Sequence, residues 1–195
     1  MDVKEEEILV TKLGMRPLHR LVYIALLAAI GMMCMLCFGF KLIPAASYLK
    51  YDPNGAVILL CGLLLGPVAG LECAVVKGVL YFLVHGGSPY GHISEFLATA
   101  TLMLVAVCLA HRFRAGGKKR ILCCAAGVLA ATIIMIPANY VILYLQHGMS
   151  AEAVTASMVY VIPFNLLKAA LNSAIALCLY APVYRALGRI LKIGE

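Results

Sequence analysis

Three polar side chains stand in the middle of an apolar run near the C-terminus of this 195-residue chain. Asn165, Lys168 and Asn172 are spaced at i, i+3 and i+7, so in a helix they project from one face. A lysine at the centre of a membrane helix costs about 2.5 to 3.5 kcal/mol. We therefore expect that face to meet a partner, a cavity or a ligand rather than lipid.

Asn139 adds a fourth polar residue, in the preceding apolar run and just after Pro137. It lies at a depth comparable with that of Asn165 and Lys168, so two helices could converge on one pocket. Each asparagine alone is explained equally well by a hydrogen bond between helices, which contributes about 0.6 kcal/mol. For Lys168 a functional site is favoured, because ionisable residues at this depth usually mark a pathway or a binding site.

A rival group of residues suggests a different chemistry. His92 and Glu95 lie at i and i+3 and, with His85 and Glu72, could form an intramembrane metal-dependent hydrolase site. The chain lacks an H-E-x-x-H motif, however, and solvated histidines are ordinary in a turn rich in Gly and Pro. We keep this enzyme as an alternative and expect no resident metal or cofactor. Lys77 could pair with Glu72 or Glu95 as a purely structural contact.

The composition is typical of a polytopic membrane protein, with 64% hydrophobic and 13% charged residues. The net charge of +7 comes from short clusters beside apolar runs, which argues against nucleic-acid binding and for membrane orientation. The eight cysteines fall mostly inside apolar runs, so we expect neither a disulfide framework nor a metal site. The first apolar run has no A-x-A-like cleavage site, and no removable signal peptide is expected.

The apolar runs predict an all-α fold, a single bundle of six transmembrane helices over residues 1–195 with a polar head at 1–16. The stretch 56–85 is too long for one span, and Gly66-Pro67 offers a turn between two short ones. A structured loop is expected at 39–55 and a polar turn at 85–93. The six spans are expected at about 17–38, 56–66, 68–85, 94–111, 121–145 and 157–181.

The basic residues orient this bundle. Four lie at the N-terminal end, five between residues 112 and 120 and three in the C-terminal tail, whereas Lys41 and Lys50 lie on the opposite face. The positive-inside rule therefore predicts that both termini are cytoplasmic and that the pocket opens outward. The chain has no P-loop, so active transport would need a partner that hydrolyses ATP.

Five segments, from LKYDPNG at Leu49 to IPFNLLKAALNS at Ile162, recur in the order and spacing of a known family. The other three are GLLLGPVAGLECAVVKGVLYFL, SEFLATA and IPANYVILY. On these motifs the chain, from about Pro17 to Tyr184, resembles the substrate-binding S components of energy-coupling factor (ECF) transporters, most of all the riboflavin-binding type. The resemblance implies a non-enzymatic subunit of the bacterial plasma membrane. It captures a vitamin from outside and works with a transmembrane T component and two cytoplasmic ATPases.

The resemblance also assigns roles to residues. It implies ligand contacts at Asn139, Asn165 and Lys168, and it places Tyr51 and Asp52 in a loop that closes over the ligand. Glu95 stands where the family has the amide of an Ala-Asn-Phe sequence, and we count it with the ligand-binding positions. Asn172 lies deeper towards the cytoplasm and is expected to pack between helices.

Two further features bear on the partner and the substrate. Ala25 and Ala29 form a small-xxx-small pair in the first span, which suits internal packing or docking, and the resemblance implies docking on the T component. The chain departs from the family at Pro53-Asn54-Gly55, where Ser-Asp usually follows the aspartate, and at Gly78, where an Asn is usual. A related flavin or another vitamin therefore remains an alternative to riboflavin.

Overall fold

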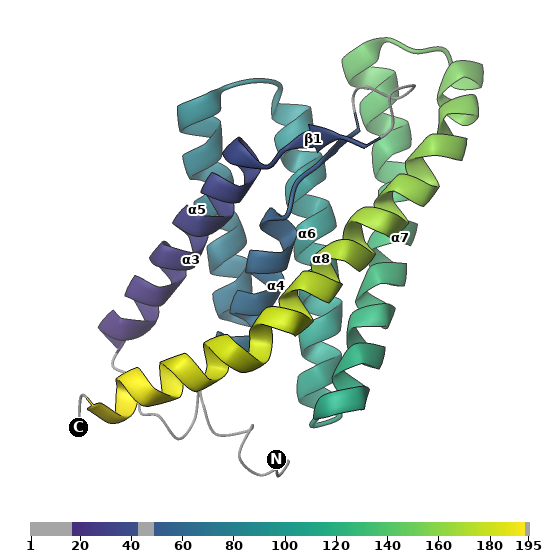
Figure 1. The fold of residues 1–195 in the computed structure, drawn as a ribbon. Coiled ribbons are helices and arrows are strands. Elements are labelled where there is room, and N and C mark those ends of the chain that lie inside the picture. Colours follow the sequence, from purple (N-terminus) through teal and green to yellow (C-terminus); the bar gives the residue numbers. More distant parts are fainter. Residues whose placement is uncertain (1–16, 43–48, 194–195) are drawn as a thin grey trace.

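The computed structural model describes residues 17–42 and 49–193 as six α-helices and one small β-hairpin (Figure 1). It confirms the predicted all-α, six-helix bundle. The elements in chain order are α3 (Pro17–Cys37), β1 (Phe40–Lys41), β2 (Lys50–Tyr51), α4 (Asn54–Leu65), α5 (Pro67–His85), α6 (Pro89–Arg112), α7 (Gly117–His147) and α8 (Ala151–Ile193).

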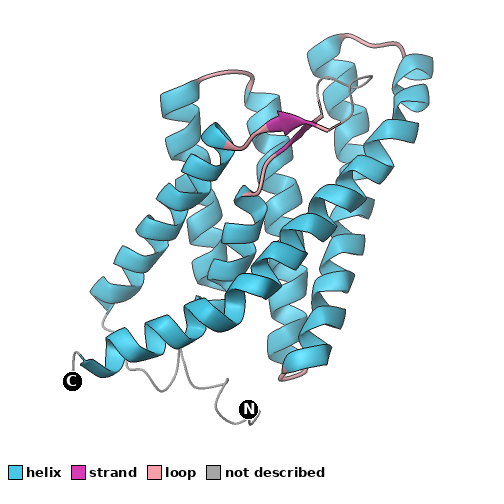
Figure 2. Ribbon diagram, viewed as in Figure 1, coloured by secondary structure: helices cyan, strands magenta, loops and turns pink. Residues whose placement is uncertain are grey.

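Successive helices run up and down through the bundle (Figure 2). The hairpin, the α5–α6 turn and the α7–α8 turn lie at one end, which we call the hairpin end. The start of α3, the α6–α7 turn and the last residue of α8 lie at the opposite end (Figure 1). Helix α4 is central and packs against α3, α5, α6 and α8. The segment between β2 and α4 therefore leads directly from the hairpin end into the core.

Helices α4 and α5 are separated at Gly66, where we expected the chain to turn. Gly66 has a φ of 96°, a left-handed conformation that residues with a Cβ rarely adopt, and Pro67 opens α5 at its first turn. Within residues 17–42 and 49–193, five helices are long and apolar enough to cross a membrane. Helix α4 has 12 residues, about 18 Å, and all of them except Leu63 are buried. It is therefore a short apolar helix enclosed by the longer ones.

Four segments differ from the expectation: in three, helices continue past the apolar runs, and in the fourth, two short strands form in the expected loop. The expected polar turn at 85–93 shortens to residues 86–88, since Gly86 and Gly87 adopt positive φ and Pro89 already opens α6. Helix α7 begins inside the basic loop. Helix α8 begins at Ala151 and continues through two prolines to Ile193. Residues 40–41 and 50–51, expected as loop, pair as antiparallel strands.

Close packing joins α6 and α7 at a single glycine. A Cβ added to Gly127 would lie 2.7 Å from the carbonyl oxygen of Leu102 and 3.0 Å from the Cβ of Ala106. Both distances are shorter than van der Waals contact, so only glycine lets the two backbones approach this closely. This contact fixes α7, and with it Asn139, relative to α6.

Candidate ligand-binding site

A cavity of about 330 Å³ lies at the hairpin end of the bundle. Its wall is formed by residues of β2 and the position before it, of the α5–α6 turn, and of helices α3, α5, α6, α7 and α8. The apolar part of the wall includes Met35, Leu49, Ala98, Met135, Ile142, Leu143 and Phe164. The polar part includes Lys50, His85, Ser88, His92, Ser94, Glu95, Asn139, Asn165 and Lys168. Four of the six residues predicted to bind the ligand therefore line one cavity.

Asn139 on α7 and Asn165 on α8 face this cavity from two helices. Each donates its side-chain amide at 2.8 Å to a carbonyl one turn earlier in its own helix, Met135 and Val161 respectively. Both side chains are nearly buried, at 7% and 8% exposure. One amide hydrogen of each is thus satisfied locally, and the amide oxygen can accept a hydrogen bond from a ligand.

Lys168 is the charged member of the α8 face, and its partner comes from the loop before α4. Its Nζ lies 3.1 Å from Oδ2 of Asp52, and both side chains are largely buried. Asp52 itself does not belong to the cavity wall. The structure therefore places Asp52 behind Lys168, where it fixes the ammonium that faces the cavity.

The groups around Asp52 favour the charged form of its carboxyl group. Burial raises the pKa of this carboxyl, but the Lys168 ammonium, the Asn54 amide and the Lys77 charge lower it by more. The net result is a pKa below the ordinary aspartate value. Asp52 is therefore a carboxylate at neutral pH, and the Asp52–Lys168 contact is an ion pair.

Asn54, the first residue of α4, joins Asp52 to Glu95. Its backbone N–H donates to Asp52 Oδ1 at 3.2 Å, and its Nδ2 donates to the same oxygen and, at 2.7 Å, to Glu95 Oε1. Glu95 Oε2 in turn pairs with Lys77, whose side chain is only 2% exposed. Of the two partners expected for Lys77, the structure selects Glu95, while Glu72 pairs with Arg20 at the surface.

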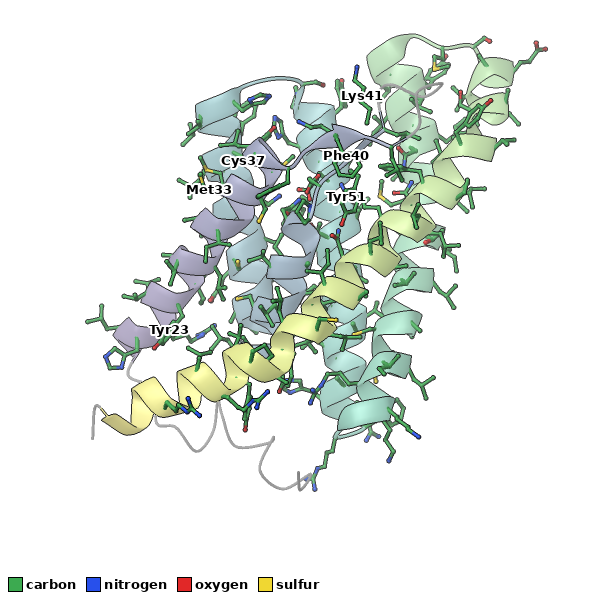
Figure 3. All side chains as sticks on the ribbon, in the orientation of Figure 1. Tyr23, Met33, Cys37, Phe40, Lys41 and Tyr51 are labelled. Atoms are coloured by element: carbon green, nitrogen blue, oxygen red, sulfur yellow. The ribbon has the colours of Figure 1, made fainter. Side chains whose placement is uncertain are left out.

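Tyr51 lies beside this network rather than in the cavity wall. Its hydroxyl donates to Asn172 Oδ1 at 3.4 Å, and its ring lies 5.3 Å from that of Phe40 (Figure 3). Asn172 thereby connects the hairpin to α8. We expected Asn172 to pack between helices, and the hydrogen bond described here instead joins it to the hairpin, so Tyr51 contributes to holding the hairpin against α8.

Comparison with known proteins decides the family. The family described as "ECF transporter, substrate-specific component" matches residues 19–180. The chain belongs to this family. It is accordingly a multi-pass transport protein of the plasma membrane and not an enzyme.

Named relatives of this S component cover most of its length. It is 30% identical to the "Riboflavin transporter RibU" of Staphylococcus aureus, over 92% of this chain and 97% of the relative. It is 29% identical to the "Riboflavin transporter FmnP" of Bacillus subtilis, over 76% and 83%. A solved S component of a bacterial ECF transporter superposes with a TM-score of 0.76 at 30% identity, covering 91% of this chain and 99% of that one.

The hydrolase alternative conflicts with both the family and the geometry. His92 Nε2 lies 2.8 Å from the carbonyl oxygen of Gly86, and its ring packs edge-on against Tyr81 and Phe82. Glu95 is engaged by Lys77. Among the residues that the structure describes, no three His, Cys, Asp or Glu side chains gather as a metal site would require. His92 therefore stabilises the α5–α6 turn of this S component.

Sequence analysis missed three contributors to the site. Asn54 was noted only as a departure from the family, although it is fully buried and bridges two carboxylates. Tyr81 and the α5–α6 turn also line the cavity. The signal for Asn54 was present in LKYDPNG, an amide at the start of an apolar run, but its partner Glu95 lies 41 residues away in sequence.

Proposed function

We propose that this S component binds riboflavin in the cavity at the hairpin end and delivers it across the membrane with a T component and two ATPases. One observation carries the proposal. Asn139, Asn165 and Lys168, from two helices, line a single vitamin-sized cavity. Relatives that match 92% and 76% of this chain are named as riboflavin transporters, and they support the choice of vitamin.

The cavity suits the chemistry of a flavin. Riboflavin has a flat ring system with an imide-like edge and a chain of hydroxyls, so its site needs apolar walls with a few fixed polar groups. Met135, Leu143 and Phe164 supply apolar wall. Asparagine can donate and accept at once, and the Lys168 ammonium donates to carbonyl or hydroxyl oxygen. The volume lies at the lower end of the ~300–1,000 Å³ range of small-molecule sites.

Glu95, Asp52 and Tyr51 take different roles in this proposal. Glu95 lines the cavity and can accept hydrogen bonds from ligand N–H or O–H groups. Asp52 acts through Lys168, and Tyr51 secures the loop through Asn172. In this loop, Leu49 and Lys50 would cover the ligand, because they line the cavity.

The hairpin end faces outward in this proposal. Among the described residues, Lys41 and Lys50 lie in the hairpin, whereas the opposite end carries Arg112 at the end of α6, Arg114 in the α6–α7 turn and Arg185 near the end of α8. The positive-inside rule places the more basic end in the cytoplasm. A vitamin would then enter from outside, and both termini would be cytoplasmic.

Helix α3 is the proposed docking surface for the T component. Ala25 and Ala29 lie one turn apart, and both are exposed on the side of α3 that faces away from the bundle. Ala28, one position from Ala29, is fully buried. Small residues on an outward face permit the close approach of another transmembrane helix.

Titration of the purified protein with riboflavin tests the function. Binding should quench the fluorescence of added riboflavin at micromolar protein or below, with one vitamin per chain. A preparation that is yellow and releases flavin on denaturation would support the same conclusion. Competition with thiamine, biotin and flavin analogues separates riboflavin from the alternative vitamins. A colourless protein that leaves riboflavin fluorescence unchanged at micromolar concentrations would contradict the substrate assignment.

A further inference from the structure

Lys77 is the largest fully buried side chain in the described part of the molecule, at 1% exposure. It does not line the cavity, and the binding role proposed above makes no use of it. A lysine is almost never buried unless its charge is compensated. Its ammonium pairs with Glu95, and the sulfur of Met35 lies 3.9 Å away. The question is what this costly buried charge does.

Lys77 is one end of a buried chain of contacts that ends at Lys168. From Lys77 the chain continues through Glu95, Asn54 and Asp52. Carboxylates only accept hydrogen bonds, so the Asn54 amide must turn its NH₂ group towards both of them. Two ammonium groups thus balance two carboxylates, and each lysine has one carboxylate of its own.

This one-to-one pairing matters because Glu95 and Lys168 line the same cavity. Without Lys77, the carboxylate of Glu95 would be left uncompensated in a buried site. Lys168, which lines the same cavity as Glu95 and is already paired with Asp52, would then face two carboxylates. Opposite charges attract strongly at low dielectric, so Lys168 would be drawn from Asp52 towards Glu95.

We propose that Lys77 is a positioning residue for ligand binding: by engaging Glu95, it leaves Lys168 paired with Asp52 and directed at the cavity. The ligand-binding part of this inference rests on the proposed function. The positional part concerns only side chains of this chain and can be measured without any ligand.

Chemical labelling of lysines reads the position of Lys168 directly. Only a neutral amine reacts with an amine-directed reagent, so an ammonium held between two carboxylates should be labelled more slowly. In Lys77→Met, we expect labelling of Lys168 to slow by about fivefold or more, as quantified by mass spectrometry in detergent. Exposed Lys41 serves as the internal reference. Faster or unchanged labelling of Lys168 would overturn the inference, because an ammonium that gains a second carboxylate partner must react more slowly.

A compensating double variant separates positioning from folding. Lys77→Met with Glu95→Gln removes both the cation and the carboxylate that competes for Lys168, and replacing a buried ion pair as a whole is often tolerated. Labelling of Lys168 should return to the wild-type rate within about twofold. A rate that stays low in the double variant would refute the role of Glu95, and this result can be obtained even if Lys77→Met alone does not fold.

Arg20→Met is the matched control. It breaks the Arg20–Glu72 ion pair, which also joins α5 to another element but whose side chains are 39% and 46% exposed. Surface pairs contribute little, so Lys168 labelling should not change. If Arg20→Met slows labelling as much as Lys77→Met does, the effect is not specific to the buried chain and the inference fails.

Riboflavin binding extends the test. Lys77→Met should weaken riboflavin affinity by at least about tenfold, or ~1.4 kcal/mol, with the fraction of binding-competent protein unchanged. Unaltered affinity together with slowed labelling would refute the ligand-binding part. If the wild-type protein binds no riboflavin at all, the proposed function fails, while the labelling results still decide whether Lys77 positions Lys168.

Discussion

Lys168 and Asp52 form an ion pair in which only the lysine lines the cavity. Lys168 lines the cavity, whereas Asp52, whose carboxylate neutralises the Lys168 charge, does not. An unpaired charge at this depth would be expensive, whereas a paired one can be held in place for a ligand. The two asparagines follow the same pattern, because each is anchored to its own helix and faces the cavity.

Replacement of Lys168 should separate binding from stability. Lys168→Met should lower riboflavin affinity at least about tenfold, or ~1.4 kcal/mol, because the cavity loses its cationic donor. It should also lower the unfolding temperature, because Asp52 is left unpaired. The double variant with Asp52→Asn should recover stability but not affinity, as measured by fluorescence titration and thermal unfolding. Lys118→Met, at an exposed position at the opposite end, is the control; affinity as high as wild type in Lys168→Met would remove Lys168 from the site.

The lowered pKa of Asp52 predicts how its contribution to stability depends on pH. An acid whose pKa is lower in the folded state stabilises that state at every pH above the unfolded value of ~3.9. The contribution is lost as pH falls through the folded-state pKa. The difference in unfolding temperature between wild type and Asp52→Asn should therefore stay constant from pH 8 to about pH 5 and shrink below about pH 4. A difference that already disappears near pH 6 would mean that the carboxylate is not held by Lys168.

At the scale of elements, the site depends on where helices begin and how closely they pack. Helix α4 starts at Asn54, two residues after Asp52, so one short segment places an amide and a carboxylate between α6 and α8. The positive φ of Gly66 lets α4 stop after 12 residues and reverse into α5. Helix α5 can then bring Lys77 back beneath the cavity.

Gly127 tests the packing of α6 against α7. Gly127→Ala should destabilise the protein by about 1–3 kcal/mol, because its Cβ would collide with the backbone of α6. For a chain of this size this corresponds to roughly 2–4 °C in unfolding temperature for each kcal/mol. Gly78→Ala makes the same chemical change inside α5, where a Cβ would meet nothing within 4 Å. It should be neutral or slightly stabilising; equal losses in both variants would contradict the close α6–α7 contact.

At the scale of the whole molecule, a polar cavity at one end is combined with an apolar exterior. Large apolar side chains are exposed along the outer faces, among them Leu83, Ile133 and Val159. In a membrane these faces meet lipid, whose contact with apolar side chains needs no further partner. The outward Ala25–Ala29 pair is different, because small side chains leave room for another helix.

Bulky substitutions on α3 should uncouple transport from binding. Ala25→Trp or Ala29→Trp should abolish riboflavin uptake in cells that express the complete transporter, because the T component could no longer approach. Riboflavin binding by the purified variant should be unchanged, since both positions lie outside the cavity wall. Leu21→Trp, on the exposed surface of the same helix, provides a comparison in which a large side chain replaces a large one. Normal uptake in the alanine variants would refute the docking surface.

The amino-acid sequence alone determined the class of the fold, the division of residues 56–85 at Gly66 and three cavity-lining residues, Asn139, Asn165 and Lys168. These are local properties, because apolar runs, breaker residues and a polar group in an apolar run can be recognised from neighbours in sequence. Only the tertiary structure decided that Lys77 pairs with Glu95, that Asn54 bridges Glu95 to Asp52 and that Asp52 stands behind Lys168. The last pair joins residues 116 positions apart. Buried charges choose their partners by distance in three dimensions, and helix packing, which sequence periodicity does not specify, sets that distance.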